Sequence, residues 1–194
     1  MPVVTTDAQR QREGYLFLAA FTLCIPAANW LIGNAGTVCI PNGPCLIPVA
    51  PYIYPDLMAP SGVLMVGLAL VLRDLVQRRL GIPFVLAAIA LGALLSAAVA
   101  PPALIIASGV AFLLSELADF AVYTPLQRKR FVLAVFLSGL VGLVVDSAVF
   151  LYLAFGSLDF LAGQVVGKTW MVVLSLPLIA WLRARDARLQ IESA

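Results

Sequence analysis

The chain has 194 residues, of which 62% are hydrophobic and only 11% are charged. About a quarter of the residues in an ordinary soluble domain are charged, so this composition excludes that class. The formal net charge of +2 gives no indication of a nucleic-acid partner. The absence of histidine removes the commonest metal ligand and the commonest general base near neutral pH. The sequence therefore predicts no metal site and no cofactor, and any proton handling must rely on carboxylates, lysine or tyrosine.

Six apolar stretches are predicted to cross a membrane as helices. At a rise of 1.5 Å per residue, about 20 residues cover a hydrocarbon core of about 30 Å. The first stretch follows a polar segment and lacks a small-residue cleavage site, which indicates a first span and not a cleavable signal peptide. The fold class expected is all-α, a polytopic membrane protein with a six-transmembrane-helix bundle. Within one integral membrane domain covering residues 1–194, we expect spans at 14–32, 61–79, 82–99, 103–123, 131–155 and 160–182.

The positions of the basic residues predict the orientation of these spans. On one side lie Arg10 and Arg12 and the basic residues within 73–79, 128–130 and 183–188. On the other side, the loops at 33–60, 100–102 and 156–159 contain no Lys or Arg. The positive-inside rule then places the N- and C-termini in the cytoplasm. This assignment leaves Lys168 as the one basic residue expected inside the membrane.

The outer loop at residues 33–60 contains six prolines and many apolar side chains. The prolines exclude a regular helix, yet the loop is too apolar for a solvated linker. We expect a folded lid that lies on the outer surface or dips between the helices. Cys39 and Cys45 are close enough in sequence to form a disulfide there, whereas two thiols without histidine make a poor zinc site. Cys24, in the first span, is expected to be a buried small hydrophobe.

Three of the predicted spans carry ionisable side chains. Glu116, Asp119 and Tyr123 share one face of the fourth span, and Asp146 lies in the fifth. One ionised carboxylate near the bilayer centre costs at least ~2.5–3.5 kcal/mol, so such groups need partners, protons or a function. We therefore expect them to meet in one enclosed site. The candidate substrate-binding residues are Asn29, Glu116, Asp119, Phe120, Tyr123, Asp146, Gln164, Lys168 and Trp170.

The charges of these candidates do not balance. Glu116, Asp119 and Asp146 face Lys168 alone, which leaves two uncompensated negative charges. At least one acid should then be protonated, be paired with a cationic ligand or face water. The competing interpretation is a purely structural Lys168–Asp146 pair, with Glu116 capping a backbone defect.

Several motifs along the chain resemble one family. They are Pro-Ser-Gly-Val-Leu (60–64), Leu-Arg-Asp-Leu-Val-Gln (72–77), Ser-Glu-Leu-Ala-Asp-Phe-Ala-Val-Tyr (115–123), Gly-Leu-Val-Val-Asp-Ser-Ala-Val-Phe (142–150) and Gly-Gln-Val-Val-Gly-Lys (163–168). These motifs resemble the VUT family of six-helix bacterial queuosine precursor transporters. The resemblance implies uptake of 7-cyano-7-deazaguanine or 7-aminomethyl-7-deazaguanine across the inner membrane, for synthesis of a modified tRNA base. The cysteine-containing, proline-rich outer loop departs from the family pattern.

A guanine-like ligand suggests roles for the candidate residues. Its ring N–H and amino group are a two-pronged donor that one carboxylate, Glu116 or Asp119, could accept. Gln164 or Lys168 would donate to the ligand carbonyl, while Phe120 or Trp170 would stack on the ring. Asp146 would hold Lys168 or carry the coupling proton. The expected partners are this small molecule and the lipid bilayer, and the residues leave open whether the protein forms a homodimer.

Three other functions remain open. We expect a proton-coupled secondary carrier, but the chain could be the substrate-binding subunit of a vitamin-type importer energised by a separate ATPase. It contains no Gly-rich Lys-Ser/Thr loop of its own. An intramembrane enzyme is disfavoured because the sequence has no Glu-x-x-His pair and no Gly-x-Ser-x-Gly turn. A scaffold or membrane-insertion helper would use the buried charges for assembly and would bind no small molecule.

Overall fold

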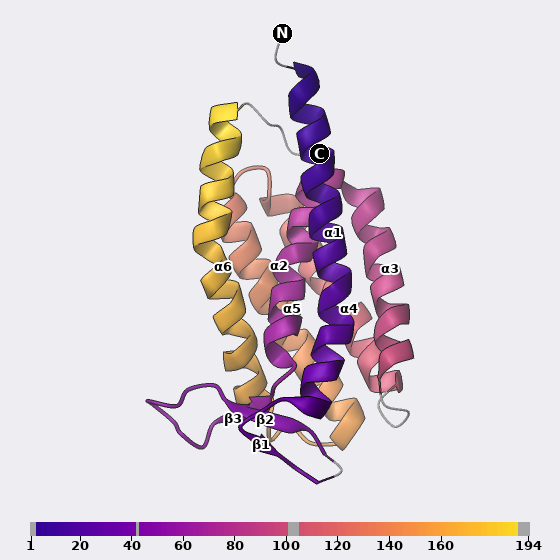
Figure 1. The fold of residues 1–194 in the computed structure, drawn as a ribbon, viewed down its shortest axis with the longest axis vertical. Coiled ribbons are helices and arrows are strands. Elements are labelled where there is room, and N and C mark those ends of the chain that lie inside the picture. The colour runs from indigo at the N-terminus through magenta and orange to yellow at the C-terminus, as the bar shows by residue number, and fades with distance from the viewer. Residues whose placement is uncertain (1–2, 42, 101–104, 190–194) are drawn as a thin grey trace.

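The computed structural model describes residues 3–41, 43–100 and 105–189, which form a bundle of long helices with a small sheet at one end (Figure 1). The elements are α1 (Val3–Asn34), β1 (Val38–Cys39), β2 (Cys45–Pro48), β3 (Met58–Pro60), α2 (Val63–Leu80), α3 (Ile82–Val99), α4 (Ile105–Leu126), α5 (Phe131–Phe155) and α6 (Leu161–Leu189). The predicted loop at 100–102 and the predicted start of the fourth span at 103 fall on residues 101–104, outside the described residues.

Within the described ranges, five of the helices, α1, α3, α4, α5 and α6, are long and apolar enough to cross a membrane. The exception is α2, which carries Arg73, Asp74, Arg78 and Arg79. No residue of α2 is exposed, and α2 contacts each of the other five helices. Its charges are therefore enclosed by protein and not by lipid, which is how so polar a helix fits in the bundle. The prediction of an all-α polytopic membrane protein is confirmed.

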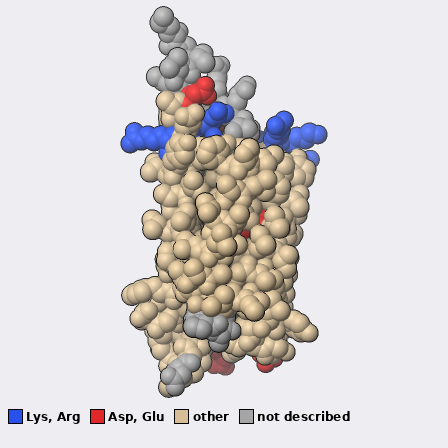
Figure 2. All heavy atoms as spheres, turned by 90° about the vertical axis from the view of Figure 1, so that its right-hand side faces the viewer, with Lys and Arg blue, Asp and Glu red and all other residues tan. Residues whose placement is uncertain are grey.

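Basic side chains mark one end of the bundle. On the face shown in Figure 2, Lys and Arg gather at the end where α1 begins, and the long middle section shows none of them. Because α6 ends at this same end (Figure 1), the positive-inside rule places both outermost helix ends of the described chain on the cytoplasmic side. The sheet lies at the opposite, outer end.

The outer loop forms a three-stranded antiparallel sheet, with β2 between β1 and β3. Cys39 pairs with Cys45 across β1 and β2, and their side chains form a disulfide. Two of the prolines, Pro48 and Pro60, end β2 and β3, where a missing N–H is tolerated. This outer sheet contacts α1 through β2 and α6 through β3. It therefore packs over the outer mouth of the bundle, while Cys24 is a buried free thiol inside it.

Close helix approaches position the polar residues of the interior. A Cβ on Gly67 of α2 would lie only 2.6 Å from the carbonyl oxygen of Lys168, so α2 and α6 meet at the level of that lysine. On α3, Ala88, Gly92 and Ser96 repeat every four residues and form its buried face. Small residues at this spacing allow neighbouring helices to approach closely.

Candidate functional site

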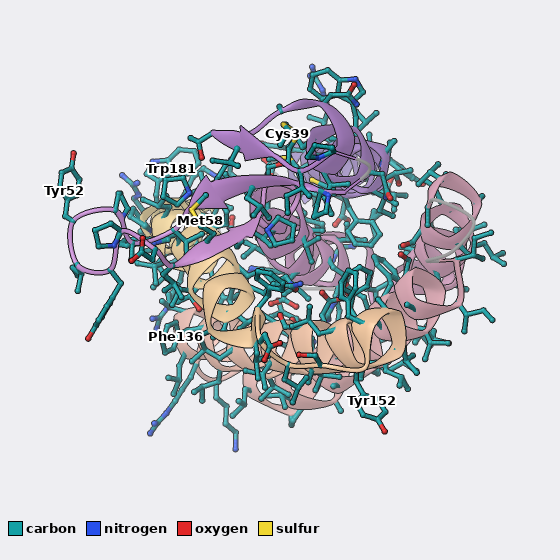
Figure 3. The ribbon with its side chains drawn as sticks, turned by 90° about the horizontal axis from the view of Figure 1, so that it is seen from below. Cys39, Tyr52, Met58, Phe136, Tyr152 and Trp181 are labelled. Carbon is teal, nitrogen blue, oxygen red and sulfur yellow. A yellow bond between two sulfur atoms is a disulfide. The ribbon has the colours of Figure 1, made fainter. Side chains whose placement is uncertain are left out.

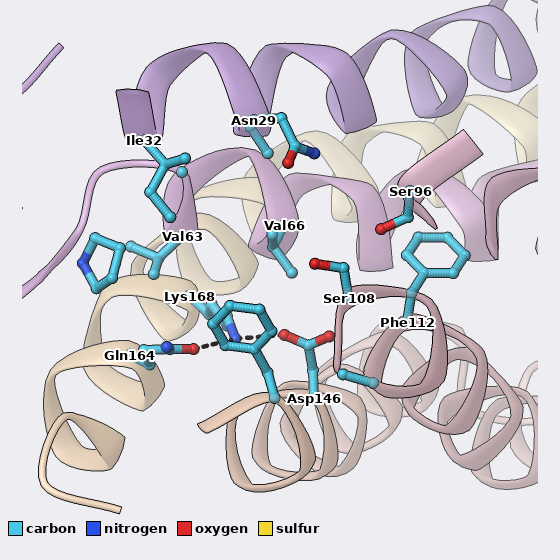
Figure 4. A pocket seen from close by; sticks show the side chains of 15 residues that line it. Asn29, Ile32, Val63, Val66, Ser96, Ser108, Phe112, Asp146, Gln164 and Lys168 are labelled. Atoms are coloured by element: carbon cyan, nitrogen blue, oxygen red, sulfur yellow. Dashed lines mark hydrogen bonds and ion pairs between the residues drawn. The ribbon is translucent and has the colours of Figure 1, made fainter. Parts of the chain in front are cut away.

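A pocket of about 120 Å³ lies in the outer half of the bundle, and all six described helices contribute to it (Figure 4). We call it the outer pocket. Its lining is Ala28, Asn29, Ile32, Pro60, Gly62, Val63, Val66, Ser96, Ser108, Ala111, Phe112, Asp146, Phe150, Gln164 and Lys168. Since Pro60 ends β3, the outer sheet also forms part of the wall.

Lys168 organises the polar wall of the outer pocket. Its ammonium donates hydrogen bonds to Asp146 Oδ2 at 2.6 Å, Ser147 Oγ at 2.7 Å and Gln164 Oε1 at 2.8 Å. An ammonium has three N–H donors, so all of them are used. Lys168 is only 1% exposed, and its charge is matched by Asp146. The result is a neutral, hydrogen-bonded group that joins α5 to α6.

These bonds leave specific atoms available to a ligand. Gln164 accepts from Lys168 through Oε1, so its Nε2 amide presents two N–H donors. This amide orientation follows from the hydrogen bond that the ammonium must donate. Asp146 uses Oδ2 for Lys168, while its Oδ1 meets the hydroxyl of Ser115 at a long 3.5 Å. The wall therefore offers a donor and an acceptor side by side.

The rest of the outer pocket is mostly apolar. Val63 and Val66 of α2 face Phe112 of α4 across it, and Phe150 of α5 adds a second aromatic ring. Ser96 and Ser108 place two hydroxyls among these side chains. Apolar walls with a few polar groups are typical of small-molecule sites.

A smaller cavity of about 60 Å³ continues the outer pocket inwards. Both hollows are lined by Asn29, Ser96, Phe112 and Asp146. The smaller one also reaches Ser115 and Glu116. Glu116 therefore lies at the inner end of the same hollow, one layer deeper than Lys168.

Glu116 binds an arginine that the orientation argument placed outside the membrane. Arg73 of α2 is 0% exposed, and its Nε donates to Glu116 Oε2 at 3.0 Å. Its Nη1 is 3.0 Å from Asp74 Oδ1, and its Nη2 pairs with Asp119. Asp74 also accepts a hydrogen bond from Ser138 of α5 at 3.1 Å. The arginine cluster of Arg73, Asp74, Glu116 and Asp119 thus ties α2 to α4 and α5.

The arginine cluster corrects the prediction that Lys168 is the only basic residue within the membrane. The excess of two negative charges is unchanged, however, because the cluster adds one cation, Arg73, and one further carboxylate, Asp74. Four buried or half-buried carboxylates now face two cations, Arg73 and Lys168. A signal for Arg73 was present in the sequence: residues 61–72 alone reach only about 18 Å as a helix, too short for a span of about 30 Å. The predicted second span, 61–79, already included Arg73, although the orientation assignment counted it among the cytoplasmic charges.

Five of the predicted site residues do not line the outer pocket, and of these only Glu116 reaches the smaller cavity. Asp119 is held by Arg73, and Tyr123 is fully buried with its ring centre 5.8 Å from the Arg73 guanidinium carbon. Phe120 is half-buried, and its carbonyl accepts a hydrogen bond from Thr124. Trp170 is 49% exposed, and its indole donates to the carbonyl of Val49 in the outer loop. The aromatic rings that do line the pocket, Phe112 and Phe150, were not singled out from the sequence.

The remaining predicted residues come together. Asn29, Asp146, Gln164 and Lys168 all line the outer pocket. Ser96 of α3 lines it too. On α5, Ser138 and Asp146 are eight residues apart and share one face: Ser138 donates to Asp74, and Asp146 accepts from Lys168 two turns further out.

A third charged layer closes the cytoplasmic end. Asp186 of α6 accepts two hydrogen bonds from Arg79, each 2.9 Å long, and two from Arg78 at 3.2 and 3.4 Å. Glu13 of α1 pairs with Arg79 at 3.0 Å and with Arg185 at 2.7 Å. This cytoplasmic network of Glu13, Arg78, Arg79, Arg185 and Asp186 joins α1, α2 and α6. It leaves the outer pocket on the far side of two charged layers from the cytoplasm.

Comparison with protein families agrees with this architecture. Residues 92–182 match the family model described as "Putative vitamin uptake transporter". The match supports a VUT family assignment. The VUT-matched stretch includes Glu116, Asp146, Gln164 and Lys168, whereas Asn29 and Arg73 precede it. Comparisons with curated proteins and with solved structures gave no match.

Proposed function

We propose that this multi-pass membrane protein is a VUT-type transporter that imports 7-deazaguanines, 7-cyano-7-deazaguanine or its aminomethyl relative, across the bacterial inner membrane as a proton-coupled carrier. The observation that carries the proposal is the polar wall of the outer pocket. Gln164, oriented by Lys168, offers an amide donor, and Asp146 offers its Oδ1, which accepts only a long 3.5 Å hydrogen bond from Ser115. A guanine-type edge places its carbonyl next to a ring N–H, which is the complementary pattern.

The volume and the lining of the outer pocket support a small planar ligand. Its volume of about 120 Å³ is below the ~300–1,000 Å³ of sites for drug-sized molecules. Phe112 and Phe150 provide apolar ring surfaces on which a heterocycle can stack. Because Glu116 lies at the inner end of the hollow, it is the acceptor that a ligand would meet next on its way inwards.

The excess of negative charge supports coupling to protons. Four carboxylates share two cations, and uncompensated charge at such depth is costly. Uptake of a proton by one of these acids relieves that cost. Glu116 suits this role because it contacts both the hollow and Arg73. A proton bound to Glu116 would weaken its ion pair with Arg73.

The test is uptake of labelled 7-cyano-7-deazaguanine by cells that cannot synthesise it. We expect the chain to produce accumulation that a protonophore abolishes. Gln164→Glu keeps an acceptor for Lys168 but removes the donor to the ligand, so uptake at low substrate concentration should fall about tenfold. The matched control, Asp159→Asn at an exposed turn, should transport normally.

Proteoliposomes that contain only this chain separate the alternatives. Accumulation driven by an imposed pH gradient supports a secondary carrier. Ligand-dependent thermal stabilisation without transport would indicate a substrate-binding subunit that needs an ATPase partner. Recovery of a chemically altered ligand would indicate an enzyme, and the absence of both binding and transport would overturn the proposal.

A further inference from the structure

A second hollow lies at the cytoplasmic end, on the opposite side of the charged layers from the outer pocket. Its volume is about 460 Å³, and it opens between the start of α5 and the last third of α6. We call it the basic groove. Its lining residues are Lys129, Arg130, Val132, Leu133, Phe136, Leu176 and Arg183.

The basic groove is cationic at its cytoplasmic edge. Lys129, Arg130 and Arg183 are all exposed, and none of them pairs with an acidic residue in the described part of the chain. The nearby Arg78, Arg79 and Arg185 differ, because each of them forms an ion pair with Glu13 or Asp186. The three groove cations therefore lie beside one another without a protein counterion among the described residues.

The lower part of the basic groove is apolar on both helices. Phe136 lies five residues after the start of α5 at Phe131, and Leu176 precedes Arg183 by seven residues on α6. Five to seven helical residues span about 8–10 Å, so both side chains lie further into the membrane than the cations. Phe136 and Leu176 are half-buried, and Figure 3 shows Phe136 at the periphery of the bundle. The groove thus changes from cationic to apolar along the membrane normal.

We propose that the basic groove binds one anionic phospholipid of the cytoplasmic leaflet. Lys129, Arg130 and Arg183 hold the headgroup phosphate, and the first part of an acyl chain packs against Phe136 and Leu176. Basic pockets between transmembrane helices on this side of a membrane suit such headgroups. A free phosphate would use the cations but leave the apolar half without a partner, so the groove as a whole matches a lipid better.

The test compares lipid retention by native mass spectrometry of the detergent-purified full chain. With phosphatidylglycerol we expect one lipid to remain bound, and with phosphatidylcholine we expect weak retention. A triple variant with Lys129→Gln, Arg130→Gln and Arg183→Gln should lower the affinity for phosphatidylglycerol by about tenfold or more. The matched control carries Arg12→Gln, Arg128→Gln and Arg188→Gln, which removes three exposed charges outside the groove. It should change the affinity by less than about twofold.

A second pair of variants tests the apolar half with all charges kept. Leu176→Asn in the groove should weaken phosphatidylglycerol retention, whereas Leu174→Asn, at an exposed position outside it, should not. If both triple variants lost the same affinity for phosphatidylglycerol, the binding would be general attraction to surface charge, and the proposal would be overturned. Equal retention of phosphatidylcholine, or full displacement by inorganic phosphate, would also overturn it. Melting curves of each variant confirm that it is folded.

Discussion

At the scale of single residues, Lys168 connects the chemistry of the outer pocket to its stability. Its three hydrogen bonds leave no donor for a ligand, so its role is to orient Gln164 and to neutralise Asp146. Removing one partner of a buried ion pair is more harmful than removing both, because the remaining charge stays desolvated. Asp146 has a side chain that is 14% exposed, so this penalty is reduced but not removed.

The Lys168–Asp146 ion pair predicts how the melting temperatures of single and double variants should be ordered. Lys168→Met leaves Asp146 without its cation and should lower the melting temperature most. Adding Asp146→Asn should restore part of the loss, while uptake should stay low because the pocket has lost its acceptor charge. Thermal melting in detergent and uptake in cells measure the two effects. Equal melting temperatures for the single and double variants would show that the pair is not coupled.

At the scale of elements, α2 is stabilised by what surrounds it. The guanidinium of Arg73 contacts carboxylates on its own helix and on α4, and Asp74 reaches Ser138 on α5. Arginine suits this position because its planar fork can donate to several carboxylates at once. The arginine cluster is therefore the polar core of the bundle, and through Glu116 it reaches the smaller cavity below the outer pocket.

We predict that Arg73→Met prevents stable folding. It leaves three buried carboxylates without a cation, and breaking even one such pair typically costs ~3–5 kcal/mol. Combining it with Glu116→Gln and Asp119→Asn removes two of those charges and should recover part of the folded protein. Size-exclusion profiles and melting curves in detergent provide the measurement. Arg128→Met, at an exposed position, serves as the control, and a folded single variant at wild-type melting temperature would contradict the prediction.

The outer sheet allows one experiment to test both the Cys39–Cys45 disulfide and the orientation of the chain in the membrane. In intact cells, a membrane-impermeant maleimide should label the chain only after an impermeant reductant opens the Cys39–Cys45 bridge. Cys24 is buried and should stay unlabelled, so Cys39→Ser combined with Cys45→Ser should abolish the signal. Labelling that requires inverted vesicles would place the sheet in the cytoplasm and reverse the orientation.

At the scale of the whole molecule, the charged groups form three layers along the bundle. The outer pocket lies in the outer half, the arginine cluster lies beneath it, and the cytoplasmic network closes the other end. In the cytoplasmic network, two arginines of α2 share one carboxylate of α6, so opening this end requires Asp186 to separate from both. These ion pairs close the cytoplasmic end, which is the state that the proposed carrier would need while it receives a ligand from outside.

Weakening the cytoplasmic network should therefore open the inner side more often. We predict that Asp186→Asn speeds labelling, in inverted vesicles, of a thiol introduced by Ala134→Cys in a Cys24→Ser chain. Ala134 is fully buried one turn inside Phe131, whose ring lies 4.0 Å from the Arg78 guanidinium carbon. Asp7→Asn, which removes only an exposed i,i+3 pair with Arg10, should leave the rate unchanged. An unaltered rate in Asp186→Asn would exclude the gating role.

Much of this protein follows from the sequence by itself. Apolar length and the distribution of Lys and Arg determine that the chain spans a membrane and which way it faces, because lipid insertion depends on these quantities. A spacing of four residues places Gln164 with Lys168, and one of eight places Ser138 with Asp146, because side chains at these intervals share a helix face. The outer cysteines are close enough in sequence for a bridge, which the structure contains.

Only the tertiary structure decided which of these faces meet. Periodicity states what one helix presents on each side, but it does not give the rotation of one helix against another. Asp119 and Tyr123 therefore turned out to face Arg73, while Phe112 and Phe150 face the outer pocket. Hydropathy likewise assumes that a spanning helix meets lipid, and α2 does not. Its charges are permitted in the membrane because five neighbouring helices replace both the lipid and the water around it.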